Sequence, residues 1–415
     1  MVGFWSTCCF YATTVKTRKY CMEFNPKTFC SAPWFQIRNE QFGQYKSCPV
    51  IDESCSKFKQ DIQYRWPTHT PDDYLQSQYT VYLRKNLTEG VKLPECHRCW
   101  TQEENGNRSV RQELNNTISN NRGDNLTKSW IKPYLDQKTD YSHDHLVRAD
   151  VKLTNTCNFS CVMCNPSDSS KIYAEWSTNQ YHPVVQERLR HQPNMLQLVK
   201  ENYKDRNNHK LLELLLNQQP AYLKLLGGEP LLDKQALSIL KESKSKRTSL
   251  LFVTNGSVDL ISTSEQLADF RDVNYVVSLD GIGAVQDYIR KGSNWTSIAN
   301  NIDQWLEQYP KKKLSVHVTV QALNIKHLPA LFDWAATRNI VLGVNILSDP
   351  DFLSIAVVPP ELRIELDLPN QFDLFNTINN TTFDPDLLAK FKKYIAYYDP
   401  EQEWRSVFPE WINVL

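Results

Sequence analysis

The chain has 415 residues, which at about 150 residues per domain allows two or three domains. Hydrophobic residues make up 41% and charged residues 23%, a globular composition that excludes disorder of the whole chain. Lys plus Arg equals Asp plus Glu at 47 each, so net charge favours neither nucleic acid nor a membrane, although a local basic patch stays possible. No apolar run reaches the roughly 18 residues of a membrane span and no secretory signal is visible, so we expect a cytoplasmic protein.

Residues 1–140 are aromatic-rich and broken by prolines, which predicts a loop-rich region. The polar, Asn-rich stretch at 105–128 is typical of a linker, and we expect a domain boundary near residue 140. Arg108 and Arg111 begin this stretch. They could grip an anionic substrate, but a solvated surface is the simpler expectation.

All eleven cysteines lie within the first 164 residues. An odd number in a chain without a secretory signal argues against a disulfide framework, and the close spacing of two groups indicates metal sites. The first group is Cys30, Cys48, Cys96 and Cys99, two separated pairs that suit zinc or a closed iron–sulfur cluster. Cys55 is an alternative ligand. The remaining upstream cysteines, expected to be small buried hydrophobes, are Cys8, Cys9 and Cys21.

From residue 146 onward, short apolar segments alternate with helical ones. The predicted strands are 146–153, 222–226, 249–253, 274–279, 313–321 and 341–346. The predicted helices are 233–242, 297–308, 328–336 and 386–397, with further Leu-rich helices covering the sheet edge between the first two strands. This order implies a parallel sheet with right-handed crossovers, either open or closed into a barrel. We expect an α/β core over 141–350 and a helical extension over 351–415.

Three cysteines follow the first of these strands directly, as C-x3-C-x2-C: Cys157, Cys161 and Cys164. The carboxyl end of a strand is where α/β folds bind ligands. Three thiolates can hold three corners of an iron–sulfur cube and leave one iron open to a substrate or cofactor. The alternatives are a zinc site completed by a distant His and three unrelated buried thiols.

This loop, followed in order by LKLLGGEPLL and VVSLDG, resembles the radical S-adenosylmethionine superfamily. The resemblance implies a partial (β/α)6 TIM-like barrel and a four-iron cluster on Cys157, Cys161 and Cys164. It also implies bound S-adenosylmethionine and an external electron donor of the flavodoxin or ferredoxin type. Reductive cleavage of the cofactor would then give a 5′-deoxyadenosyl radical that abstracts hydrogen from a peptide or a polar small molecule. Nucleotide or RNA modification, and a non-catalytic metal-stabilised binding module, are the alternatives.

The resemblance also implies cofactor contacts. The expected residues are Met163, Gly227, Gly228, Glu229, Pro230, Asn255, Ser278 and Asp280. The GGEP residues would contact the cofactor amino group, whereas Ser278 and Asp280 would bind its ribose. A turn and helix capping are the alternative roles for these two motifs. Arg290 and Lys291 would either lie near the cofactor carboxylate or form a solvated helix end.

The Cys30–Gly43–Cys48 spacing resembles the element found in auxiliary-cluster extensions called SPASM and twitch domains. This implies a second four-iron cluster on Cys30, Cys48, Cys96 and Cys99, with zinc as the alternative. The sequence departs from the family in one respect, because the element precedes the barrel here and follows it there.

The predicted strand at 313–321 alternates apolar with polar residues. In a partial barrel of six strands, the lumen is not fully filled by side chains. We therefore expect the polar set to face the lumen: His317, Thr319, Gln321 and, on the next strand, Asn345.

Overall fold

The structure is a computed structural model that describes residues 27–58, 63–104, 106, 108–120, 146–204, 207–243, 245–363 and 374–415. Cys8, Cys9, Cys21 and the end of the expected linker lie outside these residues. None of the helices in the described ranges has the length and apolar character that a membrane span requires.

The core is one eight-stranded sheet with the strand order β2-β1-β3-β4-β5-β6-β7-β8. Every neighbouring pair is parallel except β1 and β2. The strands are β1 Gln36–Asn39, β2 Tyr45–Lys46, β3 Arg148–Lys152, β4 Tyr222–Leu226, β5 Ser249–Thr254, β6 Asp272–Ser278, β7 Leu314–Val320 and β8 Val341–Ile346. The last six are the predicted strands, and the sheet stays open between β8 and β2, so the partial barrel is confirmed.

Two strands come from the region that the sequence predicted to be loop-rich. β1 runs parallel to β3, with Ile37 opposite Ala149 and both almost completely buried. The four residues of β1 offer a single large apolar side chain, so they carry no alternation from which a strand could be predicted. The N-terminal region is thus joined to the barrel sheet through hydrogen bonds.

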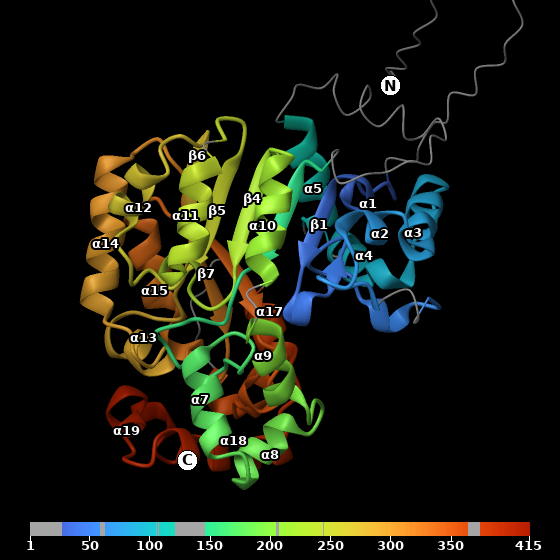
Figure 1. Ribbon diagram of the computed structural model, residues 1–415. Helices are drawn as coiled ribbons and strands as arrows, with labels where there is room; N and C mark the ends of the chain where they lie inside the picture. Colours follow the sequence, from blue (N-terminus) through green and yellow to red (C-terminus); the bar gives the residue numbers. More distant parts are fainter. Residues whose placement is uncertain are drawn as a thin grey trace, which may run out of the picture.

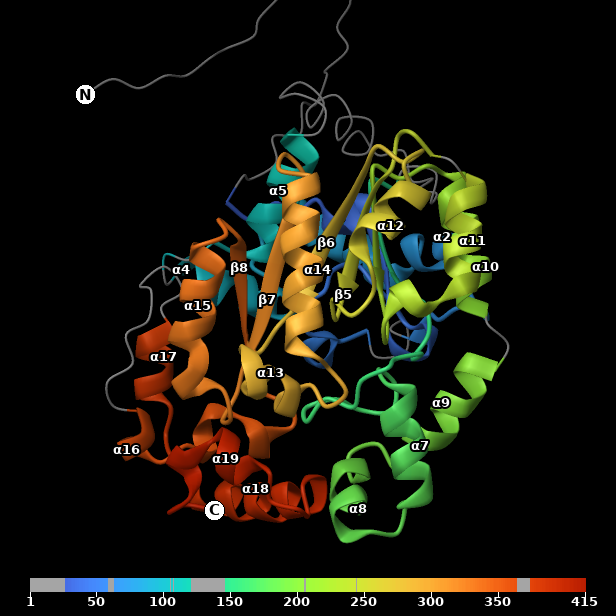
Figure 2. The same cartoon turned by 90° about the vertical axis from the view of Figure 1, so that its left-hand side faces the viewer.

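Helices cover one face of this sheet (Figures 1 and 2). They are α10 Asn207–Asn217, α11 Lys234–Ser243, α12 Leu260–Gln266, α14 Trp295–Gln308 and α15 Leu328–Ala336. Each strand sends alternate side chains into this layer, where Leu223, Leu225, Val316 and Val318 are completely buried. The intervening side chains point to the opposite face.

A second group of helices lies beyond the carboxyl end of the strands, at the bottom of Figure 1. These helices are α7 Ser170–Thr178, α8 Pro183–Leu189, α9 Met195–Lys204, α13 Gly283–Ile289, α18 Pro385–Tyr398 and α19 Trp404–Val407. The Leu-rich helix expected at the sheet edge between the first two strands is α10, which packs along β3, whereas α7 and α8 of the same segment lie at this end.

The remaining helices are α1 Ala32–Phe35, α2 Pro71–Leu75, α3 Gln78–Thr88, α4 His97–Glu104, α5 Val110–Asn120, α16 Pro360–Arg363 and α17 Leu374–Asn380. The expected linker over 105–128 was wrong in its first part, where α5 forms and buries Leu114. Arg111 is buried as well, so the expected solvated surface was wrong for this residue.

Candidate active site and metal sites

The three-cysteine loop leaves the carboxyl end of β3 and packs tightly against the β4 loop. The Gly228 amide donates to the Thr154 carbonyl at 2.9 Å, and the Glu229 amide donates to the Thr156 carbonyl at 2.7 Å. A Cβ atom at Gly228 would lie 2.3 Å from the Thr156 oxygen. Glycine is therefore required at this position for the two loops to meet.

The buried carboxylate of Glu229 connects the ends of β4 and β5. It accepts hydrogen bonds from the Leu231 amide, the Thr254 hydroxyl and the Asn255 amide at 2.6–3.1 Å. Burial raises the pKa of Glu229 to about 7, although these hydrogen bonds act in the opposite direction. Oε2 accepts a single one of these bonds, so it has room for one more donor.

The other side of the cysteine loop is held by the end of α13, by Lys291 and by α18. The Val162 amide donates to the Ile289 carbonyl, and the Ser160 amide donates to the Lys291 carbonyl, both at 2.9 Å. The hydroxyl of Tyr394 on α18 donates to the Val162 carbonyl at 2.6 Å. The backbone of the loop is thus held by hydrogen bonds from three directions.

Arg290, between these anchors, is buried beside the loop. Its Nε lies 2.8 Å from Oδ2 of the completely buried Asp280, and the other oxygen of Asp280 accepts from the Thr319 amide. The solvated helix end considered for Arg290 was therefore wrong. Lys291 lies over the Tyr398 ring instead, at 5.2 Å from its centre.

The three thiols are close enough to interact electrostatically. Burial raises the pKa of Cys161 to about 12, the neighbouring Arg290 lowers it, and Cys157 raises it further. Burial, with Asp168, Cys161 and Cys157 nearby, also raises the pKa of Cys164. A bound cationic centre would offset the charge that three neighbouring thiolates bring together, so the donor set fits an iron–sulfur cluster.

The polar residues of β7 lie where the sequence predicted. The register pairs His317 with Gly343 and Thr319 with Asn345, which places these side chains on the face opposite the helices. A Cβ atom at Gly343 would lie 2.5 Å from the His317 ring, so the glycine makes room for the imidazole. Gln321 is the exception, because it lies beyond the strand and is completely buried.

The same face carries charged residues that the sequence analysis did not single out. Asp150 on β3 pairs with Arg38 of β1 at 3.1 Å and with Arg148 at 2.9 Å. Lys224 on β4 is the register neighbour of Asp150. The available signal was a charged residue in the middle of an apolar strand, as in YLKLL around Lys224.

A second thiol site lies in the N-terminal region. Four cysteines, with Val50, Ile51, Val110, Arg111 and Leu114, line one small cavity: Cys30, Cys48, Cys96 and Cys99. Burial raises the pKa of Cys48 to about 12, and Cys99 raises it further. The spacing-based prediction that these four thiols lie together thus agrees with the geometry.

Arg111 closes this cavity and connects α5 to α4. Its guanidinium donates to the Phe29 carbonyl at 2.6 Å, pairs with Glu103 at 2.7 Å and stacks over Trp100. These contacts within the fold occupy the guanidinium of Arg111, so it does not have the substrate-binding role that was considered for it.

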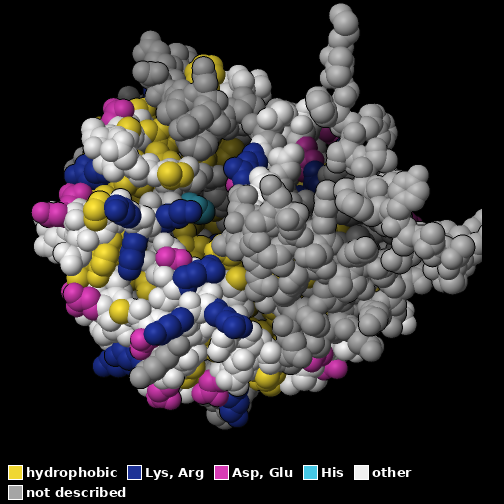
Figure 3. Space-filling view, turned by 90° about the horizontal axis from the view of Figure 1, so that it is seen from above, with side chains coloured by type: hydrophobic (Ala, Val, Ile, Leu, Met, Phe, Trp, Pro, Cys, Tyr) yellow, Lys and Arg dark blue, Asp and Glu magenta, His cyan; other side chains and the backbone are white. Residues whose placement is uncertain are grey.

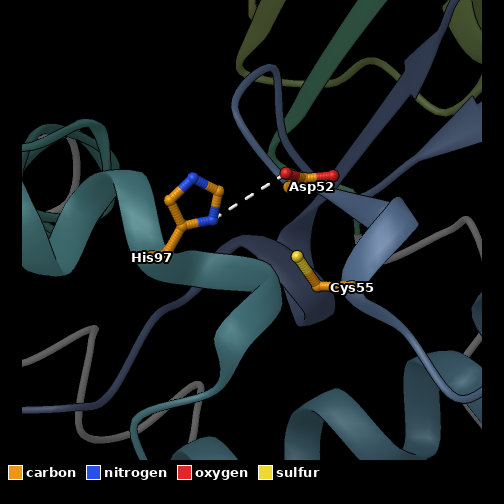
Figure 4. Close-up of side chains that lie close together, drawn as sticks. All are labelled: Asp52, Cys55 and His97. Atoms are coloured by element: carbon orange, nitrogen blue, oxygen red, sulfur yellow. Dashed lines mark ion pairs between the residues drawn. The ribbon is translucent and has the colours of Figure 1, made fainter.

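Cys55, considered as a substitute ligand, lies outside the four-cysteine cavity. It is exposed beside Asp52 and His97, and one ligand atom from each lies within 4.8 Å of the others (Figure 4). The dashed contact joins Nδ1 of His97 to Oδ2 of Asp52 at 3.9 Å.

One comparison with known proteins, the match to a family model, includes the three-cysteine site. The model of the radical SAM superfamily matches residues 151–335, a range that begins in β3 and includes the cysteine loop, the GGEP loop, Asp280 and Arg290. Residues 151–335 are therefore similar to this superfamily and are called the matched domain below. No match was found among curated proteins.

The comparison with solved structures also found matches of low identity. One is anSMEcpe with bound AdoMet and a Cp18Cys peptide, at 14% identity and a TM-score of 0.34, covering 57% of this chain and 62% of that one. Another is Streptococcus suis SuiB bound to the precursor peptide SuiA, at 15% identity and a TM-score of 0.34, covering 78% and 60%. This chain thus spans about three-fifths of each of these proteins.

Within the matched domain, the expected cofactor residues gather around the cysteine loop or at the strand ends. Gly227, Gly228 and Glu229 contact the loop or the β5 end directly. Asn255 donates to the Asn158 side chain at 2.8 Å. Ser278 is half-buried on the lumen face, whereas both oxygens of Asp280 have partners within the protein. The individual cofactor contacts stay predictions.

Proposed function

We propose that this chain is a radical SAM enzyme that acts on a peptide or a polar small molecule. The observation that carries the proposal is the three-thiol loop at the carboxyl end of β3, packed against the GGEP loop within the matched domain. Cys157, Cys161 and Cys164 would hold a four-iron cluster, and Met163, the GGEP loop, Asn255 and Ser278 would hold S-adenosylmethionine. With both groups bound, the site supplies a 5′-deoxyadenosyl radical for hydrogen abstraction.

The chain's own residues orient this site and shield it from water. The free acceptor position of Glu229 suits an ammonium group of the cofactor. Arg290 places a positive charge beside the thiolates, and its ion pair with Asp280 fixes its position. The phenol of Tyr394 covers the loop from α18 and holds the Val162 carbonyl.

Anaerobic reconstitution tests the proposal. We expect about eight iron atoms per chain, four for each cube cluster, and dithionite-dependent formation of 5′-deoxyadenosine. Iron and sulfide are counted chemically, and the nucleoside is measured by liquid chromatography. Binding of zinc without cleavage of S-adenosylmethionine would instead support the metal-stabilised binding module and contradict the proposed enzymatic function.

The four-cysteine cavity supports a second proposal, that it holds an auxiliary four-iron cluster. The cysteines would supply four ligands, which closes the site and suits electron transfer rather than substrate binding. Replacing Cys96 with Ala is expected to lower iron by about four atoms per chain, one cube. An unchanged iron content together with the loss of one bound zinc would assign the cavity to zinc.

Nucleotide or RNA modification gains no support from the basic side chains on the face that Figure 3 shows. Figure 3 views the molecule from above Figure 1, and Lys and Arg side chains gather toward the middle of the described part of that face. The three-cysteine loop lies toward the other end. This basic surface is therefore not the approach to the proposed reaction site.

A further inference from the structure

The lumen face is the face of the sheet opposite the helix layer. At its middle lies a cationic side chain whose charge has no ion-pair partner among the described residues. Lys224 lies at the centre of β4, between Leu223 and Leu225, which are completely buried under the helix layer. Alternation along the strand turns the lysine to the opposite face. Within the described residues, its ammonium has no hydrogen-bond or ion-pair partner.

The neighbouring carboxylate is already neutralised. Asp150 faces Lys224 across the β3–β4 register, but its two oxygens are bound by Arg38 and Arg148. Arg38 also pairs with Glu40. Three cations therefore meet two carboxylates, which leaves one positive charge without a counterpart.

Burial lowers the pKa of Lys224 to about 8, and Arg148 and Arg38 act in the same direction while Asp150 opposes them. The ammonium thus remains mostly charged at neutral pH. His317 lies on β7 of the same face. Burial, and to a smaller extent the charge of Lys224, lowers the pKa of His317, so this imidazole is neutral. A partly desolvated, charged ammonium without a counter-ion gains free energy when an anion reaches it.

The position of Lys224 suits recognition of a substrate held in the lumen, between the middle of the sheet and the cysteine loop. Two residues separate it from the end of β4, which at about 3.3 Å per residue places it roughly 7 Å from the sheet edge that carries the GGEP loop. A molecule anchored at Lys224 would extend toward the site where the proposed radical forms.

We propose that Lys224 binds an anionic group of the substrate, a carboxylate or a phosphate, with Asp150 and its two arginines fixing the strand beneath it and His317 as a neutral neighbour. This inference rests on the proposed function, because it makes the lumen the substrate site of a radical SAM enzyme. It narrows the substrate class to peptides or small molecules that carry a negative group.

Lysine acetylation of the reconstituted protein tests this site. The protein is treated with acetic anhydride alone or with inorganic phosphate or glutarate, and modification of each lysine is measured by peptide mass spectrometry. We expect saturating anion to slow modification of Lys224 at least about tenfold, because an anion at about ten times its Kd leaves roughly one site in ten free. Exposed Lys311 is the internal control and should react at an unchanged rate.

The two anions separate the possible groups. Protection by phosphate alone assigns a phosphate, and protection by glutarate assigns a carboxylate. Equal modification of Lys224 with and without either anion would overturn the proposal. So would a lysine that the reagent never reaches, because a substrate site must be accessible.

Calorimetric titration with the protecting anion gives an independent measurement. Lys224→Met should weaken binding at least about tenfold, and Lys224→Arg, which keeps the charge, should stay within about threefold of the parent. The same preparations are assayed for dithionite-dependent 5′-deoxyadenosine. Normal nucleoside formation without anion binding would refute the substrate site alone, whereas anion binding without nucleoside formation would refute the proposed function alone.

Discussion

Replacing Cys161 with Ala is expected to abolish formation of 5′-deoxyadenosine. The thiol is buried in the loop that contacts the GGEP residues. The two remaining cysteine ligands would not bind the cluster stably. The loss should exceed about 100-fold, because losing a second-shell partner of a metal ligand alone costs about 10–100-fold. The measurements are nucleoside formation with dithionite and the iron content, which should fall by about four atoms per chain, one cube.

Cys55→Ala is the matched control for this variant. Cys55 is exposed and lies outside both groups of converging thiols, so its removal should leave iron content and nucleoside formation at the parent level. If Cys161→Ala kept its nucleoside formation, the three-cysteine loop would not hold the reactive cluster. If Cys55→Ala also lost iron, the loss in both variants would reflect the number of cysteines in the chain and not the position of Cys161.

Replacing Arg290 with Met is expected to destabilise the protein by about 3–5 kcal/mol, the cost of removing one partner from a buried ion pair. Asp280 is completely buried, and its charge would be left facing an apolar side chain. The segment around Arg290 also supplies the carbonyls that accept from the cysteine loop, so iron content should fall together with stability. Guanidinium unfolding under anaerobic conditions measures the change.

Arg190→Met provides the comparison, because Arg190 and Glu187 form an exposed pair of the same chemistry at 3.4 Å. Exposed pairs contribute about 0–1 kcal/mol, so this variant should unfold close to the parent. The double variant Arg290→Met with Asp280→Asn should recover part of the lost stability, since no charge is then buried alone. Equal stability of the two arginine variants would show that the buried pair is unimportant.

The sequence was sufficient for the last six strands of the sheet, because each is an apolar or alternating segment with clear ends. It was also sufficient for the grouping of the four upstream cysteines. It did not predict β1, whose pairing depends on β3 more than one hundred residues away and not on its own residues. Nor did it predict Arg111 as a buried bridge, because an Arg in an Asn-rich stretch has the composition of a surface.

The lumen charges were overlooked for a related reason. Lys224 and Asp150 stand alone in apolar strands, and only the register shows that they face each other. The orientation of His317 could be predicted, since alternation along one strand needs no partner. Residues that act through a neighbouring strand require the sheet itself.

Cys30 and Cys48 flank the segment that contains β1 and β2, and β1 shares a continuous hydrogen-bond ladder with the strand that ends at the three-cysteine loop. Adjacent strands of one ladder cannot swing independently, unlike modules joined by a flexible tether. The separation between the two thiol sites is consequently built into the sheet, and a truncation that removes the upstream site also leaves β3 as a bare edge with unpaired backbone groups.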